Sequence, residues 1–499
     1  MHESSPSLPG VPPVVIGVDS STQSTKAALV AAESGTLLAV GRAPHSVSGV
    51  GGARESDPEQ WWQALRLAVA DGLAAAGVPA SCVSGIAVAG QQHGLVVLGV
   101  DGGPLRPAVL WNDVRAAPQA TALTRALGGP NAWAARTGSA PVAAMTAAKW
   151  AWLREHEPRT ASRVVAVRLP HDFLTERLSG TGVTDPGDAS GTCWYDTGKR
   201  AYDEELLALI GLDAGLLPEV AASGGARVGA LTPAAAGHLR LPAGIPVAAG
   251  TGDNMAAAVG LGLGHAGLLD HPVVSLGTSG TVFAATDARA TDPAICGFAA
   301  ADGSYLPLAC TLNCTLAVDR VASLLGLERE DAVPGGEAVL LPYLDGERTP
   351  DLPTASGLLV GLRHATTPQQ LLGAAYEGAV VTVLRALDDL LRACGLDPAD
   401  PAVAAQPLRL VGGGARGRVW QEAVRRLSGR PVVVPRQSEL VALGAAALAA
   451  SAAGGGDPVA VATGWGSGEG DQLDAVERDT ATWERVTSVL DRAAPSLLR

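Results

Sequence analysis

The stretch of residues 14–30 constrains this chain more than any other. Two apolar, β-prone runs flank a short polar loop of small residues, with Asp19 at its entrance and Lys26 at its exit. This pattern predicts a β-hairpin whose turn surrounds a ligand. Small hydroxyl residues leave backbone N–H groups free to approach a phosphate, and Lys26 adds a compact positive charge. An ordinary hairpin with a solvated turn is the alternative, because short motifs are weak evidence.

Asp19 and Lys26 carry the chemistry of this loop. Asp19 follows a buried strand, where a carboxylate is placed to hold a hydrated magnesium ion, which prefers few carboxylates and several waters. The chain has 36 basic residues, of which only three are lysines: Lys26, Lys149 and Lys199. Where arginine is the default, a lysine is favoured at positions that need a compact ammonium group.

Length and composition bound the class of protein. A chain of 499 residues predicts two or three domains, and its 62 glycines with much alanine suit close helix–sheet packing in an α/β fold. The net charge of −13 argues against nucleic acid as the main partner. The polar N-terminus lacks the pattern of a signal peptide, and the least polar stretch, residues 441–456, is too short to span a bilayer. Six scattered cysteines favour buried free thiols in a reducing, cytoplasmic compartment.

Polar side chains follow two predicted strands in the first half of the chain, at residues 83–90 and 108–110. A helix is expected before them, from Pro58 to about Ala76, and a further strand between them, at residues 95–100. The polar residues that follow the two strands are Gln92, His93, Trp111, Asn112, Asp113 and Arg115. In open α/β sheets ligands bind at the carboxyl ends of strands, so we expect a binding site here. A structural histidine and a plain polar turn are the alternatives.

A turn after the strand predicted at residues 241–250 carries Asp253. Thr251, Gly252, Asp253 and Asn254 lead into a helix of small residues. An aspartate at such a turn most often caps the helix that follows. It can also serve as a general base that accepts the proton of a substrate hydroxyl as the oxygen attacks phosphorus. The sequence alone does not separate these roles.

Residues 272–285 partly repeat the opening hairpin. Their small polar loop contains Gly277, Thr278 and Ser279. Two similar hairpins half a chain apart predict two related domains that face each other, with a boundary near residues 262–268. The expected division is a first domain over 14–262, a second over 268–455, and a polar segment with a C-terminal helix over 456–499.

A glycine-rich turn follows the strand predicted at residues 407–411. The spacing Gly412-x-Gly414-x-x-Gly417 fits a dinucleotide fingerprint, and Arg436 lies where an NADP-binding arginine can sit. That fingerprint normally opens its domain, and a dehydrogenase would leave both polar hairpins unexplained. We therefore prefer a glycine backbone that lies flat against an adenine or ribose.

With these motifs in order, residues 14–455 resemble the FGGY carbohydrate kinases of the actin, sugar-kinase and heat-shock ATPase superfamily. The first phosphate loop of that family, Asp-x-Gly-Thr-x-x-x-Lys, is matched by Asp19-Ser-Ser21-Thr22-Gln-Ser-Thr-Lys26, with Ser21 in place of the glycine. The adenosine segment departs at Gly417, where a serine or asparagine is common. The remaining matches lie at residues 92–94, 111–115, 252–254, 276–280 and 412–416.

The resemblance implies two actin-like (ribonuclease H-like) α/β domains, with ATP and Mg²⁺ in a cleft between them. It makes Asp253 the catalytic base and Asp19 a magnesium-associated carboxylate. The residues that it assigns to the sugar are Gln92, His93, Trp111, Asn112, Asp113, Arg115, Asp253 and Asn254. Those that it assigns to ATP are Thr22, Lys26, Gly277, Thr278, Ser279, Gly412, Gly413, Gly414 and Ala415.

Within this resemblance, the element Gln91-Gln92-His93-Gly94 implies D-xylulose as the substrate, phosphorylated at its terminal hydroxyl to give D-xylulose 5-phosphate and ADP. Related members act on ribulose, gluconate or erythritol, and these sugars stay open as alternatives. Two alternatives from other classes are the NADP-dependent dehydrogenase and a non-enzymatic actin-like ATP switch. The resemblance is also the basis for expecting a homodimer, and neither nucleic acid nor membrane is an expected partner.

Overall fold

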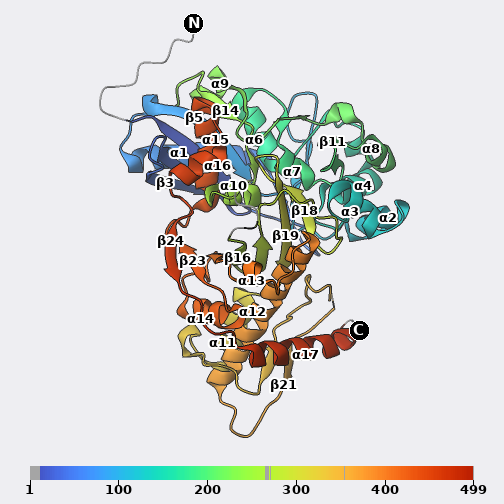
Figure 1. Ribbon diagram of the computed structural model, residues 1–499. Helices are drawn as coiled ribbons and strands as arrows, with labels where there is room; N and C mark the ends of the chain where they lie inside the picture. The colour runs from blue at the N-terminus through green and yellow to red at the C-terminus, as the bar shows by residue number, and fades with distance from the viewer. Residues whose placement is uncertain (1–11, 265–268, 270, 353, 498–499) are drawn as a thin grey trace.

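The computed structural model describes residues 12–264, 269, 271–352 and 354–497. Two seven-stranded sheets, each packed against helices, form the two halves of the molecule (Figure 1). The polar N-terminus and most of the predicted domain boundary, at residues 1–11 and 265–268, lie outside the described residues. The boundary therefore stays a prediction.

The first sheet holds the opening hairpin at its centre. Its strands are β1 (Val14–Ser20), β2 (Ser24–Ala31), β3 (Leu37–Pro44), β5 (Val83–Gly90), β13 (Arg227–Ala230), β14 (Pro246–Ala248) and β15 (Thr251–Gly252). Their order is β13-β14-β5-β1-β2-β3, with β15 paired to β5. Every residue of β1 is buried, and alternate residues face different cores: Ile16 packs with α1 (Pro58–Ala76), and Val15 packs on the other face. This two-sided burial explains the continuous apolar run.

Helix α15 (Leu440–Gly454) covers the second face of the first sheet, although in the chain it lies between two strands of the second sheet. In Figure 1 this late helix, coloured red, lies among the strands coloured blue. A Cβ on Gly17 would lie 1.9 Å from the carbonyl oxygen of Ala442, and one on Gly444 would lie 1.8 Å from that of Ala256 in α10 (Asp253–Gly260). The small residues of α15 therefore allow its backbone to approach both the sheet and α10 closely.

The second sheet repeats the hairpin-centred arrangement. Its order is β18-β19-β17-β16-β22-β23-β24. These strands are β16 (Val273–Leu276), β17 (Gly280–Phe283), β18 (Cys296–Ala299), β19 (Tyr305–Thr311), β22 (Leu408–Val411), β23 (Val432–Pro435) and β24 (Gly470–Leu473). The helices of this half are α11 (Thr315–Leu325), α12 (Pro368–Ala393), α13 (Pro401–Ala404), α14 (Arg418–Ser428) and α17 (Thr480–Leu497). Helix α16 (Pro458–Gly464) packs on α15 and α10 and so belongs with the first half. A small ribbon of β20 (Val339–Leu341) and β21 (Leu358–Val360) lies beside α12.

Short elements between residues 48 and 240 build the rest of the first half. The helices are α2 (Ala117–Ala126), α3 (Pro130–Thr137), α4 (Thr146–His156), α5 (Pro158–Ala161), α6 (Pro170–Ser179), α7 (Pro186–Ser190), α8 (Glu204–Ile210) and α9 (Pro233–Leu239). The strands are β4 (Glu55–Ser56), β6 (Val96–Leu98), β7 (Ala108–Val109), β8 (Ala166–Arg168), β9 (Val183–Thr184), β10 (Tyr195–Asp196), β11 (Ala201–Tyr202) and β12 (Glu219–Val220).

The predicted hairpins, the helix from Pro58 to Ala76 and the strand at residues 83–90 are confirmed. The prediction for residues 108–110 is wrong in one respect. β7 pairs with β4, and β6 pairs with β8, so neither belongs to the first sheet. Apolar runs of two or three residues suit a small ribbon as well as a central strand, and nothing in their composition specifies the partner.

Two further predictions concern the cysteines and the absence of a membrane span. All six cysteines are free, but only Cys193 and Cys314 are buried, and the other four are partly exposed. Within the described part of the chain, no single helix is long and apolar enough to cross a membrane. One sharply bent pair, α15 with α16, meets that criterion by length and composition alone.

Candidate active site

The register of three neighbouring strands gathers the predicted sugar and phosphate residues at one edge of the first sheet. Ser20 in β1 and Gly252 in β15 both lie opposite Gly90 in β5, and these strands run parallel. The residues that follow each strand, Ser21, Gln91 and Asp253, therefore leave the sheet at the same carboxyl edge. This is where open α/β sheets bind ligands.

The loop of the first hairpin is held by its own polar groups. The hydroxyl of Ser21 donates to Oδ1 of Asp19 at 2.5 Å, and Nζ of Lys26 lies 3.8 Å from Oδ2 of Asp19. Burial raises the pKa of Asp19, while Ser21 and Lys26 oppose that rise. A single carboxylate beside the predicted phosphate loop fits magnesium, which needs few protein ligands.

Asp253 is positioned by its neighbour Asn254. The backbone N–H of Asn254 donates to Oδ1 of Asp253 at 2.8 Å, and its side-chain amide does so at 3.1 Å. The same amide donates to Oε1 of Gln92 at 2.9 Å, which joins two of the predicted sugar residues. Burial, followed by the charges of Asp19 and Asp188, raises the pKa of Asp253 to about 7. The structure thus brings together the carboxyl group of Asp253, whose pKa is about 7, and the side-chain amides of Asn254 and Gln92.

His93 lies at the end of the segment that follows β5. Its backbone has a φ of +63°, which is uncommon outside glycine. Its Nδ1 is 2.8 Å from the carbonyl oxygen of Gly191, and its ring centroid is 5.6 Å from that of Phe298 in β18. Burial lowers the pKa of His93 to about 3, so the ring is neutral at physiological pH.

The cluster at residues 111–115 divides into two parts. The indole N–H of Trp111 donates to the hydroxyl of Thr22 at 3.0 Å, which places Trp111 beside the first phosphate loop. Asp113 is buried and accepts hydrogen bonds from the backbone of Arg54 and from the guanidinium of Arg115. Burial alone would raise the pKa of Asp113, but these hydrogen bonds hold it below its ordinary value. Arg115 forms ion pairs with both Asp113 and Glu55. In contrast, Oδ1 of the nearby Asn112 has no hydrogen-bond partner among the described residues.

The second hairpin and the glycine turn leave the second sheet side by side. Ser275 in β16 lies opposite Val411 in β22, and the N–H of Gly414 donates to the carbonyl of Leu276 at 2.8 Å. The loop between β16 and β17 contains Gly277, Thr278 and Ser279, of which Thr278 is exposed. This pairing brings the predicted phosphate loop and adenosine turn to one edge of the second sheet.

The glycine turn has one position, Gly413, at which no atom of the described residues lies close. Gly412 has a φ of +88°, and a Cβ there would lie 2.7 Å from the carbonyl oxygen of Leu276. A Cβ on Gly413 would meet nothing within 4 Å, so this residue presents bare backbone outward. Gly417 begins α14 as its N-cap without a side-chain hydrogen bond. The turn lies between strands of a seven-stranded sheet rather than opening a domain, which argues against the dehydrogenase alternative.

Three features were not assigned from the sequence. Glu439 accepts a hydrogen bond from Nζ of Lys26 at 2.6 Å, and the buried Lys149 of α4 contacts the backbone of His93. The scarcity of lysine singles out Lys149 in the sequence, but no local pattern indicates its partner. The third feature is a buried histidine cluster of four residues: His171, Asp172, Asp185 and Asp188.

The buried histidine cluster contacts the turn that carries Asp253 through Thr251. Nδ1 of His171 is 2.6 Å from Oδ2 of Asp188, and the hydroxyl of Thr251 donates to Asp185 at 2.7 Å. Burial raises the pKa of Asp188 to about 8 and those of Asp172 and Asp185 to about 6. The cluster connects α6 and α7 to the strand that delivers Asp253.

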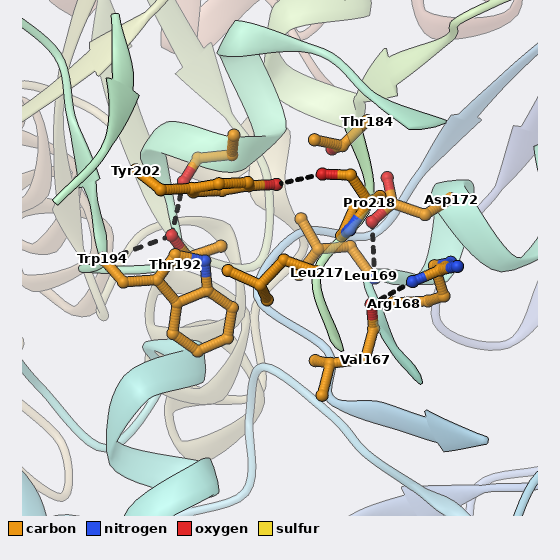
Figure 2. Close-up of a pocket in the computed structure, with 11 residues that line it drawn as sticks. Val167, Arg168, Leu169, Asp172, Thr184, Thr192, Trp194, Tyr202, Leu217 and Pro218 are labelled. Carbon is orange, nitrogen blue, oxygen red and sulfur yellow. Dashed lines mark hydrogen bonds between the residues drawn. The ribbon is translucent and has the colours of Figure 1, made fainter. Parts of the chain in front are cut away.

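Figure 2 shows a small pocket next to this cluster, with Asp172 on its wall. The hydroxyl of Tyr202 donates across it to the carbonyl of Pro218 at 2.9 Å. It has room for about one water molecule and is too small for a sugar or a nucleotide. None of the predicted site residues lines this pocket, so it is not the active site.

The two-sheet fold and the loops at its strand ends are those of a carbohydrate kinase. Residues 14–260 match the N-terminal domain and residues 273–453 the C-terminal domain of the FGGY family of carbohydrate kinases, and the chain belongs to this family.

The relatives extend the similarity over almost the whole chain. The xylulose kinase of Streptomyces coelicolor is 57% identical over 495 residues and that of Streptomyces rubiginosus 56% over 489 residues, with 98% of each chain covered. The crystal structure of a xylulose kinase from Bifidobacterium adolescentis is 32% identical, with a TM-score of 0.78 over 96% of this chain and 99% of that one. These findings confirm the predicted family and the predicted two-domain actin-like α/β fold.

Proposed function

We propose that the chain transfers the γ-phosphoryl group of ATP to the terminal hydroxyl of D-xylulose and releases D-xylulose 5-phosphate and ADP. The observation that carries the proposal is the near-complete match to two xylulose kinases at 57% and 56% identity. The grouping of Gln92, His93 and Asp253 at one sheet edge supports the same substrate class. A homodimer and a cytoplasmic location stay predictions of the sequence and its resemblance.

Asp253 is the general base of this proposal. Asn254 holds Oδ1, and no hydrogen bond to Oδ2 is present among the described residues, so Oδ2 is left to accept the hydroxyl proton. A pKa of about 7 suits this task, because a base is most effective near the working pH. As the proton leaves, the sugar oxygen attacks the γ-phosphorus, and the bond from that phosphorus to the β–γ bridging oxygen of ATP breaks.

The sugar lies against Gln92, His93 and Asn254. We place Trp111 and Asn112 at the outer side of the sugar. We place Asp113 and Arg115 behind Trp111 and Asn112, because the charges of Asp113 and Arg115 pair with each other. Adenosine lies against residues 412–415, where Gly413 exposes bare backbone. This division gives the sugar to the first half of the chain and adenosine to the second.

The phosphates lie between the two hairpin loops, near Thr22, Lys26 and residues 277–279. Asp19 is the residue that would hold Mg²⁺, since its carboxylate stands at the end of β1 beside Lys26. A bound magnesium ion supplies positive charge to the phosphoryl oxygens. Lys26 and the backbone N–H groups of both loops stabilise the charge that develops there, which is usually the largest catalytic term.

The test is sugar-dependent ADP release with ATP and Mg²⁺ across D-xylulose, L-ribulose, D-ribulose, gluconate, glycerol and erythritol. Turnover with D-xylulose well above the others would support the proposal. Turnover of another sugar would keep the mechanism and overturn the substrate. ATP binding without any sugar response would favour the ATP switch.

A further inference from the structure

Lys149 is a lysine with no exposed surface, in the first turn of α4. Its Nζ donates to the carbonyl oxygen of His93 at 2.6 Å and to that of Ala144. Burial lowers the pKa of Lys149 to about 7, and the charge of Asp113 opposes this shift. Asp113 is itself engaged by Arg115, so Lys149 forms no ion pair with a carboxylate within the described part of the chain. Burying an amine in this way is unfavourable, and its strongest contacts are two backbone carbonyls.

The carbonyl that Lys149 holds belongs to a residue in a strained conformation. His93 has a φ of +63°, which a side chain with a Cβ adopts only when its surroundings enforce it. The hydroxyl of Thr146, also in the first turn of α4, donates to the same carbonyl at 3.3 Å. Two donors from α4 therefore fix the peptide that follows His93.

The imidazole of His93 is fixed on its other side by Gly191. A carbonyl oxygen only accepts, so Nδ1 of the neutral ring carries the hydrogen that bonds to Gly191. Nε2 then carries a lone pair and has no hydrogen bond within the described residues. The positive charge of Lys149 disfavours a second proton on the ring, as burial does. His93 is thereby held as an acceptor, which suits a sugar hydroxyl.

We propose that Lys149 is a positioning residue for sugar binding: it holds the backbone of His93 in its left-handed conformation so that Nε2 accepts a hydrogen bond from a ketose hydroxyl. The proposal rests on the proposed function, which places His93 at the sugar. Lys149 itself touches neither substrate. A purely structural lysine would instead affect the sugar and nucleotide sites alike, because the apolar residues of α4 belong to a hydrophobic core that extends to β16–β19 of the second half.

The experiment is calorimetric titration of the full chain with D-xylulose in the absence of ATP, and separately with MgATP. Lys149→Met keeps an unbranched side chain that is one atom shorter and removes the donors. We expect D-xylulose binding to weaken about tenfold or more, as for loss of a hydrogen bond to a charged group, with MgATP affinity unchanged. Lys199→Met is the matched control, because Lys199 is 76% exposed and its substitution should change neither affinity.

A double-mutant cycle with His93→Ala separates positioning from general packing. In the His93→Ala background, Lys149→Met should cause no further loss of sugar affinity. An equal loss in both backgrounds, or a parallel loss of MgATP affinity, would overturn the role of Lys149. If Lys149→Met does not fold, Thr146→Val removes the second donor to the same carbonyl, and the same cycle decides. Wild-type protein that binds no D-xylulose would overturn the proposed function, whereas equal binding by wild type and Lys149→Met would overturn only the role of Lys149.

Discussion

Lys26 and Glu439 lie 413 positions apart in the sequence, yet Nζ of the lysine donates to Oε2 of the glutamate at 2.6 Å. Glu439 is the N-cap residue of α15, the late helix that covers the first sheet. Lys26 is also 3.8 Å from Asp19, so the lysine of the first phosphate loop stands between two carboxylates. The N-cap of α15 therefore contacts the predicted phosphate loop of the first half.

Replacing Lys26 by methionine should mainly impair phosphoryl transfer. The variant removes the ammonium group closest to the proposed phosphate position. We expect kcat to fall about 10²–10³-fold, the range seen when one preorganised donor is lost, while D-xylulose affinity stays unchanged. Steady-state kinetics with a sugar titration measure both. Glu439→Gln is the control, since it keeps the charge of Lys26 and should have a smaller effect. A Lys26→Met enzyme with near-normal kcat would contradict this role.

Removing the carboxylate of Asp253 should abolish most turnover without weakening nucleotide binding. Both Asp253→Ala and the isosteric Asp253→Asn remove the proton acceptor. We expect kcat to fall about 10²–10⁴-fold, the usual contribution of a general base. Calorimetry with MgATP should give an affinity close to that of the wild type, because the proposed adenosine turn belongs to the other sheet. Near-normal turnover would remove Asp253 from the role of base.

The pH dependence of turnover tests the same residue differently. A general base acts in its ionised form, and the pKa of Asp253 is raised to about 7. The value of kcat/KM for D-xylulose should therefore fall as the pH decreases below about 7, and level off above it. The residual activity of Asp253→Asn should lack this acid limb. If kcat/KM of Asp253→Asn falls at low pH in the same way as that of the wild type, the group that titrates is not Asp253.

The parts of the site that the sequence predicted are those built from neighbouring residues. The first hairpin loop, the strand end before Gln92 and the turn before Asp253 follow from runs of apolar residues interrupted by small polar ones, and β-hairpins and strand ends form from such local patterns. The start of α1 is equally local, with Pro58 in its first turn and Asp57 as a side-chain cap. The family resemblance added roles to these positions.

The parts of the site that the sequence did not predict depend on contacts between residues that are distant in the chain. Lys149 contacts a carbonyl 56 residues earlier, and Asp188 contacts a histidine 17 residues earlier in another helix. Neither pairing has a periodicity or spacing that marks it. The strand predicted at residues 108–110 is present as β7, but the sequence did not indicate that its partner is β4, because this pairing is set by tertiary packing.

Gly413 and Gly412 should respond differently to alanine. A Cβ on Gly413 meets no protein atom within 4 Å, so Gly413→Ala should leave thermal stability unchanged. It should raise the KM for ATP about tenfold, because a methyl group forced into a close contact costs about 1–3 kcal/mol. Gly412→Ala should lower Tm instead, since its φ is +88° and its Cβ would lie 2.7 Å from the Leu276 carbonyl. A Gly413→Ala enzyme with unchanged ATP kinetics would place adenosine elsewhere.

The buried histidine cluster should make stability depend on pH. The pKa of Asp188 rises from 3.8 to about 8 on folding, mainly through burial, and those of Asp172 and Asp185 rise to about 6. Between these values the folded chain binds protons that the unfolded chain has released. The contribution of these groups to stability is therefore complete below about pH 4 and is lost as the pH rises toward 8.

Asp188→Asn removes the group with the highest of these pKa values. Asparagine cannot ionise, so the variant should gain stability relative to wild type as the pH rises from 5.5 to 8.5, whatever its loss at the lower pH. The measurement is the difference in Tm between variant and wild type at the two pH values. Asp474→Asn is the matched control, because Asp474 is exposed. The difference in Tm between Asp474→Asn and wild type should be the same at both pH values. Parallel curves for Asp188→Asn and wild type would show that Asp188 is ionised in the folded protein across this range, and that His171 stabilises its charge more strongly than burial opposes it.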